Sequence, residues 1–366
     1  MSFESGSASF KVFYVPRELP KDVATRFAKF ALPPIDTLGR GELHGWVTGR
    51  HMLDRHITED TAYVAGYLRL CSVKAERKIP EALLRAECKM EELALMQAES
   101  RAFLNRADRS RIRKEVVDRL LPTMPPTLTG IPMVYDAHSR MAYAGATSEK
   151  RTDAFIINFE AAAGVTAVPL DAAAAAKKRR KLDVIDLEPV SFSPELEDKL
   201  AGNHTGQDFL TWLWFHSEAR GGSVDVEGDA YSVAIEGPLT LFLEGDGAHV
   251  AVLRNGAPLL SAEAKTALLS GKKLWRAQVT LARANETWTT GFDAREFVFS
   301  GFKMPKNEEK LDAISAFQQR MISLDRFMTA FLAFYDRFLD DRADPKAWKS
   351  VQKEIHKWVQ DRATKK

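Results

Sequence analysis

The C-terminal part of the sequence carries a long apolar repeat, and this repeat constrains the fold more than any other feature. The repeat has alternating spacings of three and four, and its residues are Ile314, Phe317, Met321, Leu324, Met328, Phe331, Tyr335 and Phe338. This heptad seam predicts a long helix with one apolar face, followed by a final helix from Pro345 to about Val359. Two interpretations are open. Either the long helix covers its own domain, or the seam residues Phe317, Met321, Leu324, Met328 and Phe331 form a dimer interface.

The rest of the sequence predicts an α+β fold, with mixed sheets, packed helices and long helices at the C-terminus. Segments rich in aromatic and β-branched residues, such as 9–15 and 62–73, alternate with helical patterns at about 80–104 and 148–163. The 366 residues, 45% of them hydrophobic, are enough for two or three domains. We expect an N-terminal α+β domain at 1–170, a basic linker at 171–186, an α+β domain at 187–305 and a helical segment at 306–366.

Composition sets limits on the function. The two cysteines, Cys71 and Cys88, lack the spacing of a metal site and indicate reduced thiols. No apolar stretch reaches the ~20 residues that a membrane-spanning helix needs, and the first residues lack the pattern of a signal peptide. We therefore expect a cytoplasmic protein with no membrane partner.

Charge is distributed unevenly, although the net charge is only +2. The segment 187–305 has ten basic residues and sixteen acidic ones, whereas the segment 101–119 has seven basic residues and three acidic ones. A locally basic surface on a nearly neutral chain is compatible with binding to a polyanion.

The basic segment 101–119 is the first candidate site for nucleic acid. A helix beginning near Asp108 or Ser110 would place Arg109 and Arg113 on one face, with Arg106 just before the helix. Arginine suits such a site because its guanidinium binds two phosphate oxygens at once. The candidate DNA contacts here are Arg101, Arg106, Arg109, Arg111, Arg113, Lys114 and Arg119. The alternative is a solvated helix whose cations pair with nearby carboxylates.

Two further basic features are candidates for DNA contact. The cluster Lys177, Lys178, Arg179, Arg180 and Lys181 is either a flexible DNA-contacting arm or a soluble linker. Arg254 lies in a turn before a short helix and is either a second DNA contact or an ordinary surface residue.

Aromatic residues at helical spacing form the next feature. Trp212, Trp214 and Phe215 could stack on bases, but their spacing favours a place in the core.

The sequence shows no pattern typical of a catalytic site. It has no Gly-rich phosphate loop, no serine nucleophile elbow and no His-Glu-x-x-His motif. His51 and His56 have no clear third metal ligand. Asp225, Glu227 and Asp229 alternate on one predicted strand, and they leave a metal-dependent nuclease as the weakest hypothesis.

Several short segments, taken in order, resemble one family. They are Phe10-Lys11-Val12, Gly45-Trp46-Val47, Lys78-Ile79-Pro80, Leu120-Leu121-Pro122, the hairpin at 132–150, the strand at 165–170, and residues 207–214 and 261–273. Their order and spacing over about residues 8–340 resemble the RdgC family of bacterial recombination-associated DNA-binding proteins. Two departures are clear: Thr123-Met124-Pro125-Pro126 stands where relatives carry basic and aromatic residues, and residues 341–366 extend beyond typical relatives.

The resemblance implies a function. Members form closed, ring-shaped homodimers whose basic central hole takes duplex DNA and limits access by RecA. We accordingly expect a nucleoid-associated homodimer that binds double-stranded DNA in a sequence-independent way, modulates RecA-dependent recombination and catalyses no reaction. No cofactor, metal or small-molecule substrate is expected. The alternative is a protein–protein interaction module that uses the heptad helix, with DNA binding incidental.

Overall fold

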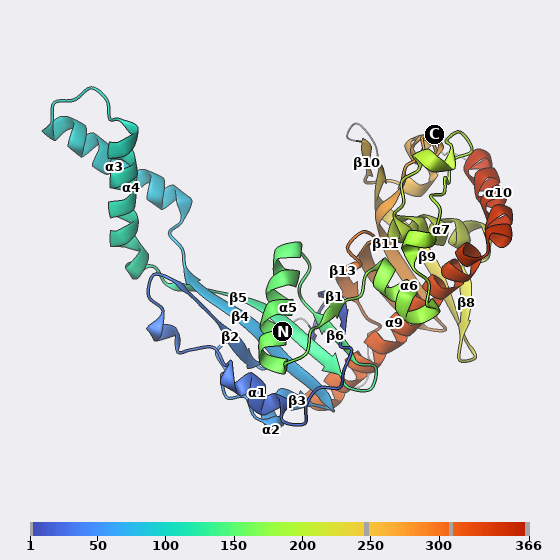
Figure 1. Cartoon of the computed structure of the whole chain (residues 1–366), viewed down its shortest axis with the longest axis horizontal. Coiled ribbons are helices and arrows are strands. Elements are labelled where there is room, and N and C mark those ends of the chain that lie inside the picture. Colours follow the sequence, from blue (N-terminus) through green and yellow to red (C-terminus); the bar gives the residue numbers. More distant parts are fainter. Residues whose placement is uncertain (1–2, 245–248, 307–309, 363–366) are drawn as a thin grey trace.

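A computed structural model describes residues 3–244, 249–306 and 310–362. It is an elongated molecule in which two lobes share one sheet and a helical hairpin projects from one end (Figure 1). The N-terminal lobe contains β1 (Ala8–Tyr14), α1 (Val23–Lys29), β2 (Glu42–Thr48), α2 (Glu59–Ala62), β3 (Tyr63–Val64), β4 (Tyr67–Arg77), β5 (Pro126–Asp136), β6 (Met141–Ala144), α5 (Glu149–Ala163) and β7 (Val168–Pro169). The projecting hairpin consists of α3 (Glu81–Ala98) and α4 (Arg106–Leu120).

The C-terminal lobe follows β7 in the chain. It contains α6 (Ala172–Arg180), α7 (Thr205–Ala219), β8 (Ser223–Val226), β9 (Asp229–Leu243), β10 (His249–Leu253), α8 (Ala262–Leu269), β11 (Lys273–Arg283), β12 (Glu286–Asp293), β13 (Val298–Lys303), α9 (Ala313–Ala343) and α10 (Pro345–Asp361). The α+β class predicted from the sequence is therefore confirmed.

Strand β1 joins the two lobes. The sheet runs in the order β10-β9-β11-β12-β13-β1-β6-β5-β4-β2, and β1 pairs with β13 on one side and with β6 on the other. Lys11 thus lies opposite both Val298 and Ala144. Every pairing between these strands is antiparallel, so the expectation of mixed sheets is corrected to one large antiparallel sheet.

The two faces of the sheet carry different helices. Side chains alternate along β1, so that Phe10 and Val12 belong to the core under α7 and α9, whereas Phe13 belongs to the core under α1 and α5. Phe155 of α5 packs on Phe13 with ring centroids 4.7 Å apart. Helix α9 covers the opposite face (Figure 1).

Several local predictions are confirmed. The hairpin of β5 and β6 forms, and α5 ends at Gly164, whose positive φ of 72° suits glycine. Trp212, Trp214 and Phe215 are fully buried, as their spacing favoured. The predicted strand at 165–170 is shorter than expected, because only Val168 and Pro169 pair with β1.

The predicted linker at 171–186 is wrong for most of its length. Its alanine run forms α6, which Asp171 caps by accepting a hydrogen bond from the Ala174 N–H at 2.8 Å. Ala175 and Ala176 are buried in the main core, against which the helix packs together with α7 and α9. Alanine has the highest helix propensity, so the segment folds once its small face meets the core.

Candidate nucleic-acid interface

The hairpin of α3 and α4 is an insertion between β4 and β5, and it extends away from both lobes (Figure 1). Its two helices hold together through a small apolar core of their own. The buried residues of this core are Leu84, Leu104, Ile112 and Val116. The hairpin therefore presents most of its polar surface to solvent.

Helix α4 begins earlier than the sequence analysis predicted. Asn105, rather than Asp108 or Ser110, is its N-cap, and the Asn105 side chain accepts a hydrogen bond from the Asp108 N–H at 2.8 Å. Arg106 is consequently the first residue of the helix and does not precede it. Arg106, Arg109 and Arg113 then stand at positions i, i+3 and i+7, which share one side of a helix. We call these three residues the α4 arginine face.

Two of the seven candidate cations here are neutralised within the hairpin. Arg119 of α4 donates hydrogen bonds to Glu91 at 2.8 Å and to Glu87 at 2.9 Å, both on α3. Arg101 lies 3.0 Å from Glu99 and 3.2 Å from Asp108. For both residues, these contacts agree with the alternative interpretation of the segment, a solvated helix whose cations pair with nearby carboxylates.

The α4 arginine face is less constrained. Arg106, Arg109 and Lys114 are exposed. Within the described part of the chain, none of these three has a carboxylate within ion-pair distance. Arg113 is 3.9 Å from Glu81, but both side chains are more than half exposed. Arg111 has similarly long contacts of 3.8 and 3.9 Å to Glu115 and Asp108. Such exposed, long ion pairs contribute little free energy and leave the cations able to bind phosphate.

The basic cluster at the end of α6 is mostly engaged in the fold. Arg179 binds Asp336 of α9 through two hydrogen bonds of 2.7 and 2.6 Å, and Arg180 binds Asp340 at 2.7 Å. The Lys178 ammonium stands 3.1 Å from the centre of the Tyr14 ring. Partial burial, reinforced by the neighbouring arginines Arg140 and Arg179, lowers the pKa of Lys178 to about 8. The expectation of a flexible arm or linker is therefore corrected.

Two members of that cluster still face solvent. Lys177 and Lys181 are exposed, and neither lies within ion-pair distance of a carboxylate in the residues described. Of the five residues in the cluster, only these two could bind a phosphate without losing an interaction that they make within the fold.

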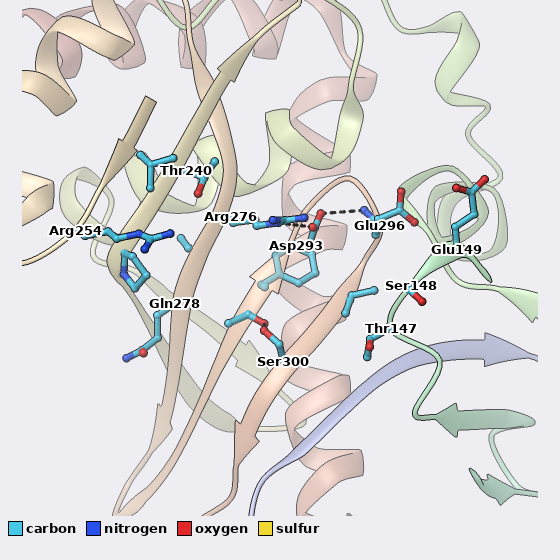
Figure 2. Close-up of a pocket in the computed structure, with 16 residues that line it drawn as sticks. Thr147, Ser148, Glu149, Thr240, Arg254, Arg276, Gln278, Asp293, Glu296 and Ser300 are labelled. Atoms are coloured by element: carbon cyan, nitrogen blue, oxygen red, sulfur yellow. Dashed lines mark hydrogen bonds and ion pairs between the residues drawn. The ribbon is translucent and has the colours of Figure 1, made fainter. Parts of the chain in front are cut away.

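Arg254 lines a pocket of about 840 Å³ between the strands of the C-terminal lobe and the start of α5. Arg276 lies on the same wall and binds Asp293 at 2.5 Å (Figure 2). Glu149 and Glu296 stand on the side of α5, so the pocket holds three carboxylates beside two arginines. This balance does not favour a concentrated phosphate site, and Arg254 is an isolated exposed cation.

The predicted dimer interface is not on the surface of the chain. Its residues, Phe317, Met321, Leu324, Met328 and Phe331, are all at most 4% exposed within one chain. Phe331 packs on Phe292 and Phe299 of the sheet, and Phe317 packs on Tyr67 of the N-terminal lobe. Helix α9 runs along both lobes and buries its apolar face against them. The other interpretation from the sequence, a long helix that covers its own chain, therefore describes α9.

The described residues show no metal centre. No group of three or more His, Cys, Asp or Glu side chains in them could hold an ion. The three predicted nuclease carboxylates do not share a strand. Asp225 is in β8, Glu227 is in the turn, and Asp229 begins β9, where Arg283 binds it at 2.6 Å.

A comparison with models of known families finds a match. The model described as "Putative exonuclease, RdgC" matches residues 10–179. The resemblance to the RdgC family inferred from the sequence is therefore confirmed over these residues. The RdgC match runs from β1 to α6 and thus contains the N-terminal lobe, the hairpin and the α4 arginine face. Arg254, α9 and α10 lie outside it, so it is shorter than the resemblance over 8–340 inferred from the sequence. A search of curated proteins finds no match to the chain.

The RdgC match is consistent with recombination-related DNA binding. Among the described residues, no helix is long and apolar enough to cross a membrane.

Proposed function

We propose that this chain binds duplex DNA through its phosphate groups, without preference for sequence and without catalysis. The observation that carries the proposal is the α4 arginine face, in which three exposed cations share one side of a helix that projects from the molecule. Contacts to phosphate need cations in reach of the backbone but carry no sequence information. The RdgC match over the same residues supports a DNA ligand.

The proposed assembly is a ring-shaped homodimer that encloses the duplex and restricts access by RecA. Because the α9 seam is internal, a dimer must use other surfaces. The α3–α4 hairpin offers exposed apolar side chains, with Met90 56%, Leu93 51% and Phe103 76% accessible. Pairing two hairpins through one self-complementary patch would fit a two-fold dimer. Holding two basic surfaces on one duplex would also raise the effective concentration of the second contact.

The test is a salt titration of duplex binding. The dissociation constant should be within a few fold for unrelated duplexes of equal length, and the logarithm of the affinity should fall steeply with the logarithm of salt concentration, by roughly 0.9 per phosphate contact. A strong preference for one sequence, or binding that salt does not weaken, would contradict the proposal. Sedimentation at micromolar concentration tests the dimer, since a 41.0 kDa monomer that binds DNA tightly would contradict the ring.

A nuclease is the second candidate, and only the description of the family model favours it. Incubating the chain with an end-labelled duplex and Mg²⁺ or Mn²⁺ decides between the two. Intact DNA under conditions of full binding supports the non-catalytic proposal. Shortening that chelation of the metal abolishes supports the nuclease, provided that the activity copurifies with the chain.

A further inference from the structure

Helix α10 carries a row of lysines on its outer side. Lys346, Lys349, Lys353 and Lys357 recur at i, i+3, i+7 and i+11, a spacing that keeps them on one side of a helix. All four are exposed. In the described part of the chain, none of them lies within 4 Å of a carboxylate. We call this row the α10 lysine stripe.

The opposite side of α10 is fixed to the C-terminal lobe. Trp348, Val351, Ile355 and Val359 are at most 4% exposed, and the helix packs on α7, α8 and α9. The lysines are therefore presented on a rigid support.

Polar contacts fix the same helix and neutralise its flank. Trp358 donates a hydrogen bond to Glu218 at 2.9 Å, and Arg362 binds the same carboxylate at 2.7 Å. Glu354, on the flank of the stripe, is bound by Arg220 through two hydrogen bonds of 3.0 Å. The acidic neighbour nearest in sequence to the middle of the stripe is thus already paired with a cation. The two carboxylates at the helix ends, Asp344 and Asp361, lie outside ion-pair distance of the lysines in the residues described.

We propose that the α10 lysine stripe is a second contact surface for the phosphate backbone of a nucleic acid, separate from the α4 arginine face. The inference rests on the proposed function for its ligand class. The stripe runs from Lys346 to Lys357, and its eleven steps of 1.5 Å give a length of about 16.5 Å. A duplex carries one phosphate charge about every 1.7 Å of its axis, so a stripe of this length lies within reach of several phosphates. Lysines act here as point charges, which suits contact without sequence readout.

Two other anionic partners fit less well. Helices that lie on membranes bury an apolar face in the lipid, and the apolar face of α10 is already buried in the protein. An acidic protein partner would need apolar anchors beside the charges, and the stripe has none between its lysines. Figure 1 places α10 at the outer edge of the C-terminal lobe, at the opposite end of the molecule from the hairpin. One phosphate surface therefore cannot be a continuation of the other.

The experiment compares two double variants of the full chain that each remove two positive charges. K349Q/K353Q alters the stripe, whereas K21Q/K29Q alters two exposed lysines beside and in α1 and serves as the control. We expect the stripe variant to reduce the salt slope of duplex binding by roughly 2, and the control to leave it unchanged. Both variants should keep the circular dichroism spectrum and melting temperature of the wild type.

Each other outcome has a defined meaning. If the wild type binds duplex DNA and both variants keep its salt slope, the stripe is not a nucleic-acid surface, although the proposed function stands. If the stripe variant instead loses binding to vesicles with 30% anionic lipid and keeps binding to DNA, the partner is a membrane and the inference is wrong. If the wild type binds no DNA in the same assay, the proposed function itself fails.

Discussion

Arg179 and Asp336 connect the end of α6 to the C-terminal half of α9 by two hydrogen bonds, of 2.7 and 2.6 Å. The residues are 157 positions apart in the chain, and Asp336 is largely buried, with a side-chain exposure of 13%. Arg180 adds a contact to Asp336 at 3.3 Å. A cluster that looks like a nucleic-acid arm in the sequence is thus partly a structural clamp, and this clamp can be tested separately from DNA binding.

Replacing Asp336 with Asn should destabilise the fold, because it leaves the Arg179 guanidinium partly buried without a carboxylate. Hydrogen bonds to charged groups contribute about 1.5–3 kcal/mol, and partial exposure of Arg179 places the expected loss at the lower end of this range. Urea unfolding measures it. Asp340→Asn is the matched control, because Asp340 is 55% exposed and its pairing with Arg180 should contribute less than about 1 kcal/mol. Equal losses in the two variants would contradict the clamp.

Lys178 gives a prediction for pH. Its folded-state pKa of about 8 is below the ordinary value of 10.5, mainly because burial disfavours the charge. Between these values the unfolded chain binds more protons at this site than the folded chain does. The contribution of Lys178 to folding stability should therefore rise as pH increases from about 8 to 10.5.

The measurement isolates this residue by difference. Urea unfolding of the wild type and of Lys178→Met, at pH 7.5 and 9.5, should show the wild type gaining stability relative to the variant at the higher pH. The comparison also removes the effect of Cys71, whose buried thiol has its pKa raised to about 12 and acts in the opposite direction. If the difference between the two proteins does not change with pH, the ammonium is solvated or the Tyr14 ring beneath it offsets the burial.

The long helix and the local elements could be predicted from the sequence because their signals are local. The apolar repeat from Ile314 to Phe338 predicts α9, and Gly164 predicts the end of α5. What the repeat cannot show is its partner, since Phe331 meets Phe292 and Phe299 only when the sheet has formed. A heptad pattern looks the same whether a second chain or the same chain covers it.

The interface could be predicted only in part, for the same reason. The basic composition of α4 is visible in the sequence, but the N-cap was misplaced because Asn105, Asp108 and Ser110 are all good caps. Which arginines are neutralised depends on α3, where Glu87 and Glu91 bind Arg119. The spacing of the α10 lysines is visible in the sequence. The burial of the opposite face, which only the structure shows, is what fixes these lysines on the outer side of the helix.

Leu324 tests the position of the seam. It is 1% exposed in the core between α9 and the sheet. Leu324→Ala should cost about 2–5 kcal/mol of folding stability through lost burial and a cavity, without changing the oligomeric state of the folded fraction. Thermal unfolding and sedimentation measure the two quantities. If the variant keeps its stability but sediments as a smaller species than the wild type, the seam is an interface between chains and this prediction is wrong.

The final prediction concerns which face of α4 binds phosphate. Replacing Arg109 and Arg113 by Ala should weaken binding to every duplex and reduce the salt slope by roughly 2, because each lost phosphate contact removes about 0.9. The control replaces Arg101 and Arg119 by Ala, which removes the same charge from the hairpin at two residues that bind carboxylates. Arg119 is held by Glu87 and Glu91, so its loss should change the slope less. It should instead loosen the hairpin, which limited proteolysis can detect. Equal slopes for the two variants would mean that DNA senses only the net charge of the hairpin, and the assignment of phosphate contacts to one face would then be wrong.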